Sequence, residues 1–456
     1  MNFEDVERNV EVGKITHDGI SIWPVLKSYL IDIAGEHKVI KEMNTSYIKI
    51  LLKNLIGDLW SLREIGKSEY WVFSNSQTRF HINEDSFDRV TTGLLKYLKG
   101  YMFFENPIPK GRTEAKRLQK GEHYIGMSWI YLVQFIILKC TRSPKIENLN
   151  LLESYLKKDI SKIRYIYHRI QAGKKLYNFL FKLYRPKVIF LVCYYSNFEL
   201  ILAAKKNNIP VIELQHGLVA NGHRAYHFKE RQPNAFLPDY FLSYGNYASN
   251  TVVKGNLFER AQVLEYGYTF IEEVEERLNI SSELKEIKNA FRKTVCITGQ
   301  LQVTDVLLLN VISSISNTFP DICFIFKPRR YSEQTAFNST ANFFTLGHLN
   351  TYELLKYCDY HLTVYSTCAL EALALGTPNI CLDINGLYNK HLKTILGNNP
   401  YNFTAGSGEE LAKVLNEMGD RTFIKSEVKN SISHFFSPQI DPETFLEFFD
   451  RASNWK

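Results

Sequence analysis

The sequence lacks a hydrophobic run long enough to cross a bilayer. Its longest apolar stretch, residues 129–138, is about half of the roughly 20 residues that a membrane-spanning helix needs. The first 14 residues are acidic and have no apolar centre, so we expect no secretory signal peptide. These absences predict a cytoplasmic protein, whose contact with a membrane would be peripheral, at the inner face of the plasma membrane.

Cysteine is too scattered for a disulfide framework or a zinc site. None of the seven cysteines forms a C-x-x-C pair, and most of them lie in apolar stretches. We therefore expect reduced thiols in the core.

Several motifs for nucleotides and metals are also missing. There is no G-x-G-x-x-G, and the segment that ends in Gly66-Lys67-Ser68 has serine at position 61, where a P-loop requires glycine. No Asp-x-Asp pair follows a predicted strand in the second half of the chain, so we expect no metal and no other cofactor. The net charge of +7 suits anionic ligands or an anionic membrane surface and does not indicate nucleic acid.

What the sequence does contain describes a folded protein with more than one domain. Its 456 residues exceed a single ordinary core, and 45% hydrophobic with 23% charged residues is typical of globular proteins. Apolar runs of strand length alternate with helical patterns, which predicts parallel sheets of the α/β class. The predicted strands are residues 70–74, 100–105, 188–192, 210–214, 239–243, 263–266, 295–297, 323–326, 361–365 and 379–382.

Three other segments have distinctive compositions. Residues 157–187 hold ten Lys and Arg against one Asp, with apolar residues at helical spacing, which predicts a pair of helices with a basic face. That face is either solvated or meets anionic lipid or a lipid-linked acceptor. Residues 272–293 predict one charged helix that connects two domains. Residues 106–122 are basic and interrupted by Gly and Pro, which predicts a loop near the site.

The most informative stretch is residues 359–383, DYHLTVYSTCALEALALGTPNICLD. It reads as strand, turn, short helix and strand. Ser366 and Thr367 are good residues for a helix start, Gly376 can close the helix in the left-handed conformation, and Pro378 prevents its continuation.

Glu371 interrupts the apolar pattern of that short helix. A carboxylate in such a place is costly unless something binds it. The N-terminus of the helix favours anions, so phosphates at this end and ribose hydroxyls on Glu371 would suit a nucleotide. The alternative is an ion pair between Glu371 and a neighbouring Lys or Arg.

The spacing Ser366-Thr367-x-x-x-Glu371-x-x-x-x-Gly376-x-Pro378 resembles the donor-nucleotide motif of GT-B fold glycosyltransferases. More narrowly, the chain resembles bacterial surface-polysaccharide transferases of the capsule and lipopolysaccharide type. The motif covers about 25 residues, and a looser order of elements extends over residues 184–382.

The resemblance implies an α/β protein of the GT-B type, with two Rossmann-like domains whose parallel sheets face each other across a cleft. Residues 1–280 would form the acceptor-side domain with a helical N-terminal extension. Residues 281–430 would bind the nucleotide-sugar, and residues 431–456 would form a C-terminal helix that crosses back to the first domain.

A second motif, Gln215-His216-Gly217, follows the predicted strand 210–214. Gly217 permits an unusual backbone angle or the close approach of a ligand, and an imidazole at a strand end can act as a general base. Similar His-Gly sequences at strand ends occur in the transferases that the chain resembles, which supports a functional role. The alternative is a structural histidine bonded to a turn.

The loop after this motif carries His223 and Arg224. Its histidines follow no familiar spacing of metal ligands. They would contact phosphate or the acceptor, and the alternative is a plain surface loop.

Basic residues end a predicted strand of the second domain. The resembling families often have Lys-x-His-Pro where this chain has Lys327-Pro328-Arg329, so a base at this position is in doubt and phosphate clamping by Lys327 and Arg329 is favoured. A solvated run of charge is the alternative. Gly299 and Gln300 end the strand before it and could hold a diphosphate through backbone N–H groups.

The resemblance and these residues together predict a glycosyltransferase that moves a sugar from a nucleotide-sugar donor to a glycan or lipid-linked acceptor. Retaining relatives often carry a second glutamate eight positions before the first, and here that position is Thr363. A reaction that inverts the configuration of the anomeric carbon is therefore favoured. Without an Asp-x-Asp pair, we expect this reaction to need no metal. His216 would be the base, with Glu105 and Asp239 in reserve. The alternatives are a polyol-phosphate (teichoic-acid-type) transferase, a nucleotide-sugar 2-epimerase and a non-catalytic sugar-nucleotide-binding subunit.

Overall fold

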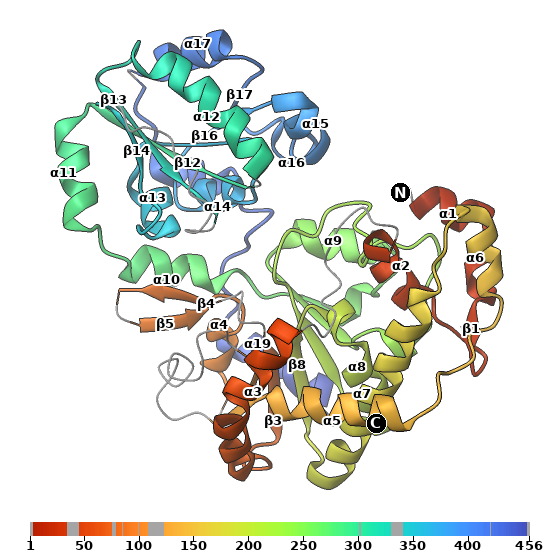
Figure 1. Ribbon diagram of the computed structural model, residues 1–456. Coiled ribbons are helices and arrows are strands. Elements are labelled where there is room, and N and C mark those ends of the chain that lie inside the picture. The colour runs from red at the N-terminus through yellow and green to blue at the C-terminus, as the bar shows by residue number, and fades with distance from the viewer. Residues whose placement is uncertain are drawn as a thin grey trace. The chain divides into compact units, whose positions relative to one another are not determined.

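The computed structural model describes residues 3–33, 45–74, 79–83, 85–98, 100–107, 123–300, 302–329, 341–419 and 421–453. The chain forms two compact units, each with its own parallel sheet (Figure 1). The first unit contains Met1–Phe80, Asp85–Tyr268 and Pro438–Lys456, and the second contains His81–Glu84 and Thr269–Ser437. The predicted α/β class with two Rossmann-like domains is therefore confirmed. The predicted loop 106–122 lies, from residue 108 onward, outside the described residues.

The first sheet has seven parallel strands in the order β11-β10-β9-β8-β3-β6-β7. They are β3 (Tyr70–Ser74), β6 (Met102–Glu105), β7 (His123–Gly126), β8 (Val188–Val192), β9 (Val211–Leu214), β10 (Tyr240–Ser243) and β11 (Val263–Glu265). The chain adds strands on one side of β3 and then, from β8 onward, on the other side. In such sheets, ligands bind at the carboxyl ends of the strands near the point where the order reverses.

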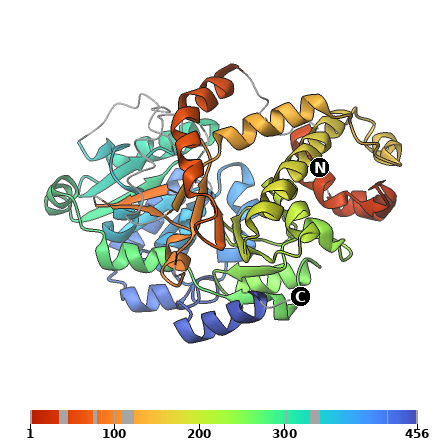
Figure 2. The ribbon, with the colours of Figure 1, turned by 90° about the horizontal axis from the view of Figure 1, so that it is seen from below.

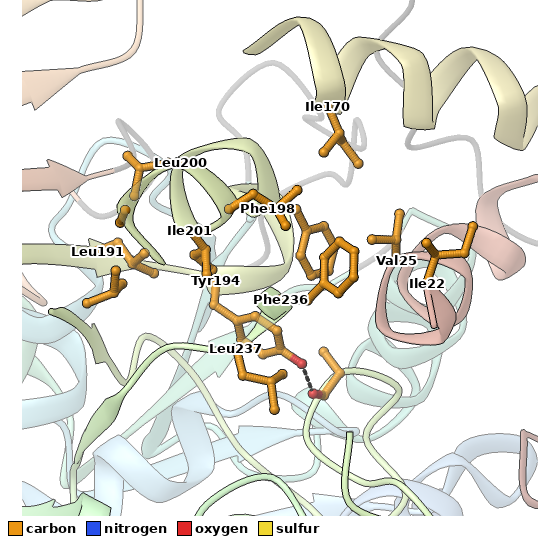
Figure 3. Packing of buried hydrophobic residues seen from close by; sticks show 14 of the residues in the cluster. Ile22, Val25, Ile170, Leu191, Tyr194, Phe198, Leu200, Ile201, Phe236 and Leu237 are labelled. Atoms are coloured by element: carbon orange, nitrogen blue, oxygen red, sulfur yellow. Dashed lines mark hydrogen bonds between the residues drawn. The ribbon is translucent and has the colours of Figure 1, made fainter. Parts of the chain in front are cut away.

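Helices cover both faces of this sheet. A large core joins one face to α2 (Trp23–Ile33), α3 (Thr45–Trp60), α5 (Ser128–Cys140), α7 (Lys162–Tyr184) and α8 (Phe198–Lys206). Figure 2 shows α3, α5 and α7 side by side in this layer. Figure 3 shows Phe198 of α8 beside Phe236, with ring centroids 6.0 Å apart. Val25 of α2 and Ile22, which directly precedes α2, lie on the same side of this pair. The opposite face packs against α4 (Thr92–Leu95) and α19 (Pro442–Ser453).

The expected helical pair in residues 157–187 is wrong, because α7 is a single helix of 23 residues. Gly173 lies in its middle. A Cβ atom there would lie 2.7 Å from Nε2 of Gln134 and 2.8 Å from Cβ of Glu199. The glycine therefore permits close packing between α7 and its neighbours α5 and α8 and does not break the helix.

The second sheet has six parallel strands in the order β14-β13-β12-β15-β16-β17. They are β12 (Lys293–Thr298), β13 (Ile322–Lys327), β14 (Phe343–Thr345), β15 (Tyr360–Thr363), β16 (Asn379–Leu382) and β17 (Asn402–Ala405). The strand order reverses between β12 and β15. The edge strands β7, β14 and β17 were not predicted, because short edge strands carry little of the continuous apolar pattern of central strands.

The second unit begins earlier than expected, after Tyr268 rather than after residue 280. The expected single helix over residues 272–293 is wrong and is replaced by α10 (Thr269–Arg277) and α11 (Ser282–Ala290). α10 ends at Arg277, and Ser281 starts α11, because its side chain accepts a hydrogen bond from the N–H of Leu284.

The other helices of the second unit that bear on the site are α12 (Gln302–Ser316), α13 (Thr351–Tyr357), α14 (Cys368–Ala374) and α17 (Gly408–Gly419). Of these, α12 and α17 pack with the sheet in a second core. None of the helices in the described part of the chain combines the length and the apolar composition that a bilayer crossing requires.

Candidate functional site

Helix α14 begins at the point where the order of the second sheet reverses, directly after β15. Thr367 occupies the N-cap position without a side-chain bond, while Oγ of Ser366 accepts from the N–H of Cys368 at 3.2 Å. Gly376 ends the element with φ of +83°, as predicted from the sequence. The predicted strand, helix and strand are thus confirmed, and the helix start faces the edge where this class of sheet binds ligands.

Glu371 is buried on α14, with 8% of its surface exposed. Its Oε1 accepts a hydrogen bond of 2.7 Å from the hydroxyl of Tyr352, which belongs to α13. The ring of Tyr352 is in turn fixed edge-on against Phe270, with centroids 5.0 Å apart. A carboxylate can accept about four hydrogen bonds, so the bond from Tyr352 is compatible with a further donor from a ligand.

Buried polar side chains connect the second sheet to α14. Nδ1 of His361 lies 2.8 Å from Oδ1 of Asn379, and Nε2 lies 2.8 Å from Oγ1 of Thr298. The amide nitrogen of Asn379 donates to the carbonyl of Ala369 in α14 at 2.7 Å. Since this fixes Oδ1 of Asn379 as an acceptor, Nδ1 of His361 must carry the proton and Nε2 must accept from Thr298.

This network determines where α14 sits, because it links β12, β15 and β16 to the first turn of the helix. Burial lowers the pKa of His361 to about 4, which keeps the ring neutral as the network requires. The sequence alone did not indicate a role for these residues. The available signal was a set of polar residues within three otherwise apolar strands.

The loop after β12 has internal partners for the N–H groups that we expected to hold a diphosphate. The N–H of Gly299 donates to the carbonyl of Lys327 at 2.9 Å, and that of Gln300 donates to Oδ1 of Asp305 at 2.7 Å. The expectation that both groups are free donors is therefore wrong. Gly299 has a packing role instead, because a Cβ there would lie 2.7 Å from Oδ2 of Asp305.

Lys327 ends β13, and its ammonium donates to the carbonyl oxygen of Gly347. Burial lowers the pKa of Lys327. Arg329 lies two residues further along with an exposed side chain. Both residues thus lie at the carboxyl edge of the second sheet, and because an ammonium has three N–H donors, a phosphate could bind Lys327 alongside Gly347.

His216 lies at the carboxyl end of β9 in the first unit. Gln215 holds the turn beside it, because its amide nitrogen donates to the carbonyl of Gly217 at 2.8 Å and its oxygen accepts from the N–H of Tyr244 at 2.7 Å. Gly217 does not have a positive φ, so the expected unusual backbone angle is wrong. A Cβ at Gly217 would meet no neighbour within 4 Å, which leaves room for a ligand to approach.

The ring of Tyr195 lies between His216 and His223 of the loop after β9. The hydroxyl of Tyr195 lies 3.4 Å from Nε2 of His216, and the ring of Tyr195 lies 6.0 Å from that of His216 and 5.9 Å from that of His223. His223 also packs against Tyr226 at 4.9 Å. The structure therefore brings His216 and His223 into one cluster, with Arg224 directly following.

Both histidines are neutral near pH 7. Burial, reinforced by the positive charge of Arg89, lowers the pKa of His216 to about 4. Burial, the neighbouring His216 when it is protonated, and the positive charges of Arg224 and Lys27 lower the pKa of His223 to about 4. A neutral His216 can accept a proton, but with this pKa it is a weak base unless a nearby anion offsets Arg89.

Sequence analysis also missed Glu213, which is fully buried on β9. Its Oε1 accepts from the N–H of Tyr194 at 3.0 Å and from the hydroxyl of Tyr226 at 2.6 Å. Burial raises the pKa of Glu213 to about 8, so the carboxyl group is protonated at neutral pH. A third bond in this group, marked in Figure 3, runs from the hydroxyl of Tyr194 to the carbonyl of Ala225. Together these bonds hold the loop after β9.

The two reserve carboxylates lie at different edges of the first sheet. Glu105 ends β6 and is buried at the same edge as His216. Asp239 precedes β10 and bonds to Lys205 and to the N–H of Val211. It therefore lies at the amino edge, away from His216. Across the described ranges, no three His, Cys, Asp or Glu side chains gather as a metal site would require.

No family model and no curated protein matches the chain. Solved structures are similar to it. The UDP-GlcNAc 2-epimerase from Methanocaldococcus jannaschii has a TM-score of 0.53 at 12% identity, over 84% of this chain and 99% of the other. Another UDP-N-acetylglucosamine 2-epimerase gives 0.52 at 13%, over 84% and 95%. The glycosyltransferase of kitacinnamycin gives 0.53 at 9%, over 84% and 99%. These similarities establish a fold of the GT-B type.

Proposed function

We propose that this protein is an enzyme that transfers a sugar from a nucleotide-activated donor to a glycan or lipid-linked acceptor of a bacterial surface polysaccharide. The observation that carries the proposal is Glu371. It is a buried carboxylate on a helix that starts at the reversal point of a parallel sheet, where ligands of such sheets bind. The two hydroxyl groups of a ribose can donate hydrogen bonds to such a carboxylate.

On the donor side, Glu371 accepts the ribose hydroxyls, and the phosphates lie toward Ser366 and Thr367. Lys327 and Arg329 lie at the same carboxyl edge of the second sheet as the start of α14, and they balance the charge of the leaving nucleoside diphosphate. Gly299 contributes by keeping its loop close to Asp305 and not through its own N–H.

On the acceptor side, His216 removes the proton from the attacking hydroxyl through Nε2. The acceptor oxygen bonds to the anomeric carbon as the bond to the diphosphate oxygen breaks, and the electron pair leaves with the nucleotide. A single displacement of this kind inverts the configuration. His223 and Arg224 contact the acceptor or a phosphate, while Gln215 and Gly217 shape the turn that presents His216.

A nucleotide-sugar 2-epimerase is the second candidate, because epimerases are as similar in structure to this chain as the glycosyltransferase is. An epimerase must break a C–H bond at C2 and needs no acceptor. Incubating the protein with candidate nucleotide-sugars in deuterated water separates the two reactions. Deuterium at C2 with no acceptor present would replace the transferase proposal by an epimerase.

Donor binding comes first among the experiments. Thermal unfolding is followed with UDP, GDP, CDP, CMP and dTDP, and a nucleotide at 100 times its Kd should add about 2.7 kcal/mol of stability. Turnover with added glycan acceptors then separates an enzyme from a binding subunit, and transfer of a polyol phosphate would indicate the teichoic-acid-type reaction.

Glu371→Gln tests whether the buried carboxylate of Glu371 binds the nucleotide. A neutral amide in place of the carboxylate should weaken nucleotide binding by ~1–3 kcal/mol while the fold persists. The matched control is Asp359→Asn, since Asp359 directly precedes β15 at the opposite edge of the same sheet and accepts a hydrogen bond from the N–H of Thr294 at 2.9 Å. The proposal fails if Glu371→Gln lowers stability and leaves nucleotide affinity unchanged.

A further inference from the structure

The outer surface of the helical layer on the first unit has an unusual composition. Leu52, Ile56, Leu59 and Trp60 form one stripe along α3, with exposed fractions of 54%, 73%, 46% and 67%. Their spacing places all four on one side of the helix. The other side of α3 packs on the core through residues such as Leu55.

Neighbouring helices continue this surface. α5 lies between α3 and α7 and contacts both. Ile136 of α5 is 59% exposed, and Phe179 and Leu183 of α7 are 63% and 59% exposed. All three helices pack on the same face of one sheet (Figure 2), so these side chains belong to one outer surface.

Positive side chains alternate with the apolar ones. The exposed lysines of the three helices on this surface include Lys49, Lys53, Lys139, Lys175 and Lys182. The sequences of α5 and α7 contain no Asp or Glu, and α3 contains only Asp58. Asp58 is 2% exposed and bonds to the N–H of Ser128 at 3.0 Å, so it adds no charge to the surface.

The segment after α3 reinforces the pattern. The guanidinium of Arg63 lies 5.9 Å from the ring centroid of Trp60. Glu64 is partly buried and compensated by Lys67 at 2.9 Å and by His123 at 2.8 Å. The exposed surface of the described parts of α3, α5 and α7 therefore combines bulky apolar side chains with positively charged ones.

We propose that this surface of α3, α5 and α7 docks the protein on an anionic lipid bilayer. Apolar and aromatic side chains that alternate with lysines suit the boundary between lipid headgroups and acyl chains, where the apolar groups enter and the ammonium groups meet lipid phosphates. A second copy of the same surface would bring like charges together, which disfavours a symmetric dimer through it. The inference does not depend on the chemistry proposed above.

Vesicle binding tests this inference. We expect the full chain to sediment with vesicles of phosphatidylcholine and phosphatidylglycerol at low salt, and to bind vesicles of phosphatidylcholine alone at least about tenfold more weakly. Lys175→Gln combined with Lys182→Gln should lower binding to the anionic vesicles about 25-fold, because each cation contributes about fivefold. Higher ionic strength should weaken the wild type more than this variant.

The apolar part is tested by Ile56→Ser combined with Trp60→Ser, which should weaken binding to anionic vesicles at least about tenfold. Leu446→Ser is the matched control, because Leu446 is 47% exposed on α19 at the other face of the sheet. Trp60→Phe should keep the binding and remove a blue shift of tryptophan fluorescence on vesicles.

Three results would overturn the inference. They are no binding to anionic vesicles at low salt, wild-type binding by the Ile56→Ser/Trp60→Ser variant, or self-association of the free protein that this variant abolishes. Nucleotide stabilisation of the same variants is measured in parallel. If it persists while vesicle binding is absent, the docking surface is wrong and the proposed function stands.

Discussion

At the scale of single residues, the protonation of His216 decides what this side chain can do. Its pKa is lowered to about 4 by burial and by Arg89, and its Nδ1 has no hydrogen-bond partner among the described residues. The ring is thus neutral in the free protein. An anion that binds near Arg89 would raise this pKa and make His216 a stronger proton acceptor.

His216→Ala should lower turnover by ~100-fold or more and leave donor affinity nearly intact, because a general base acts in the chemical step. Wild-type activity should fall as the pH drops through the pKa of His216 in the donor complex, and the residual activity of the variant should lose this acid limb. Rates and donor affinity measured across pH check both statements.

His223→Ala is the control for general disturbance of the loop. If His216→Ala instead raises the Kd for the donor and leaves turnover unchanged, His216 is a phosphate ligand. Glu105, at the same edge of the sheet, then becomes the residue to test as the base.

Glu213 links stability to pH with the opposite sign from a buried neutral histidine. Its pKa is raised to about 8 in the folded protein, so its contribution to stability is complete below the ordinary pKa of a glutamate and is lost as the pH rises through 8. The free energy of unfolding of Glu213→Gln should therefore exceed that of the wild type by on the order of 1–3 kcal/mol at pH about 9, with a smaller difference near pH 5.

Chemical denaturation of wild type and Glu213→Gln at the two pH values provides the measurement. Tyr226→Phe is a useful companion, because it removes the hydroxyl that donates to Glu213 and leaves the ring in place. Equal pH dependence of the wild type and the Gln variant would show that Glu213 is not the titrating group.

At the scale of elements, the unit from β15 through α14 to β16 places the donor-side residues. The polar network through His361 and Asn379 fixes the first turn of α14 against the sheet. Asn379→Ala would leave the ring Nδ1–H of His361 without its partner in a dry environment, which costs about 1–3 kcal/mol, and would remove the side-chain bond to the carbonyl of Ala369.

We therefore expect Asn379→Ala to lower the free energy of unfolding by ~2–4 kcal/mol and to weaken nucleotide binding, because α14 carries Glu371. Denaturation curves and nucleotide titrations measure the two effects. Asn402→Ala is the control, since Asn402 also lies on a strand of this sheet but bonds to Tyr388, away from α14. If the Asn379→Ala protein is destabilised but binds nucleotide with unchanged affinity, the polar network does not position the nucleotide site.

At the scale of the whole molecule, the chain leaves the first unit after Tyr268 and returns to it at Pro438. α19 completes the core on one face of the first sheet. Its Phe449 lies 5.3 Å from the ring of Tyr70 and 5.8 Å from that of Phe190, and Phe445 is 1% exposed. The end of the chain thus contributes to the stability of the domain in which the chain begins.

Phe449→Ala should destabilise the first unit by ~3–5 kcal/mol and leave the second largely unaffected, because the cavity forms beneath β3 and β8. Hydrogen exchange in β8 and β12 compares the two units within one sample. Leu446→Ser on the exposed side of α19 should change neither. Equal loss of protection in both sheets would mean that the two units do not unfold separately.

The sequence by itself determined the α/β class, the central strands and the strand, helix and strand around Glu371. These rest on local physics, namely continuous apolar runs for buried parallel strands and residues that start and end helices. It misjudged α7 and residues 272–293, because a glycine required by close packing resembles a helix break, and a helix start at Ser281 resembles a helix interior.

Only the tertiary structure decided how the polar residues are paired. The bonds of Glu371 to Tyr352, of His361 to Asn379 and of Gly299 to the carbonyl of Lys327 join positions far apart in the sequence. The low pKa of His216 and the high pKa of Glu213 likewise depend on burial by distant segments. Local patterns carry no trace of such contacts, because desolvation and hydrogen bonding are set by whatever the fold brings alongside each group.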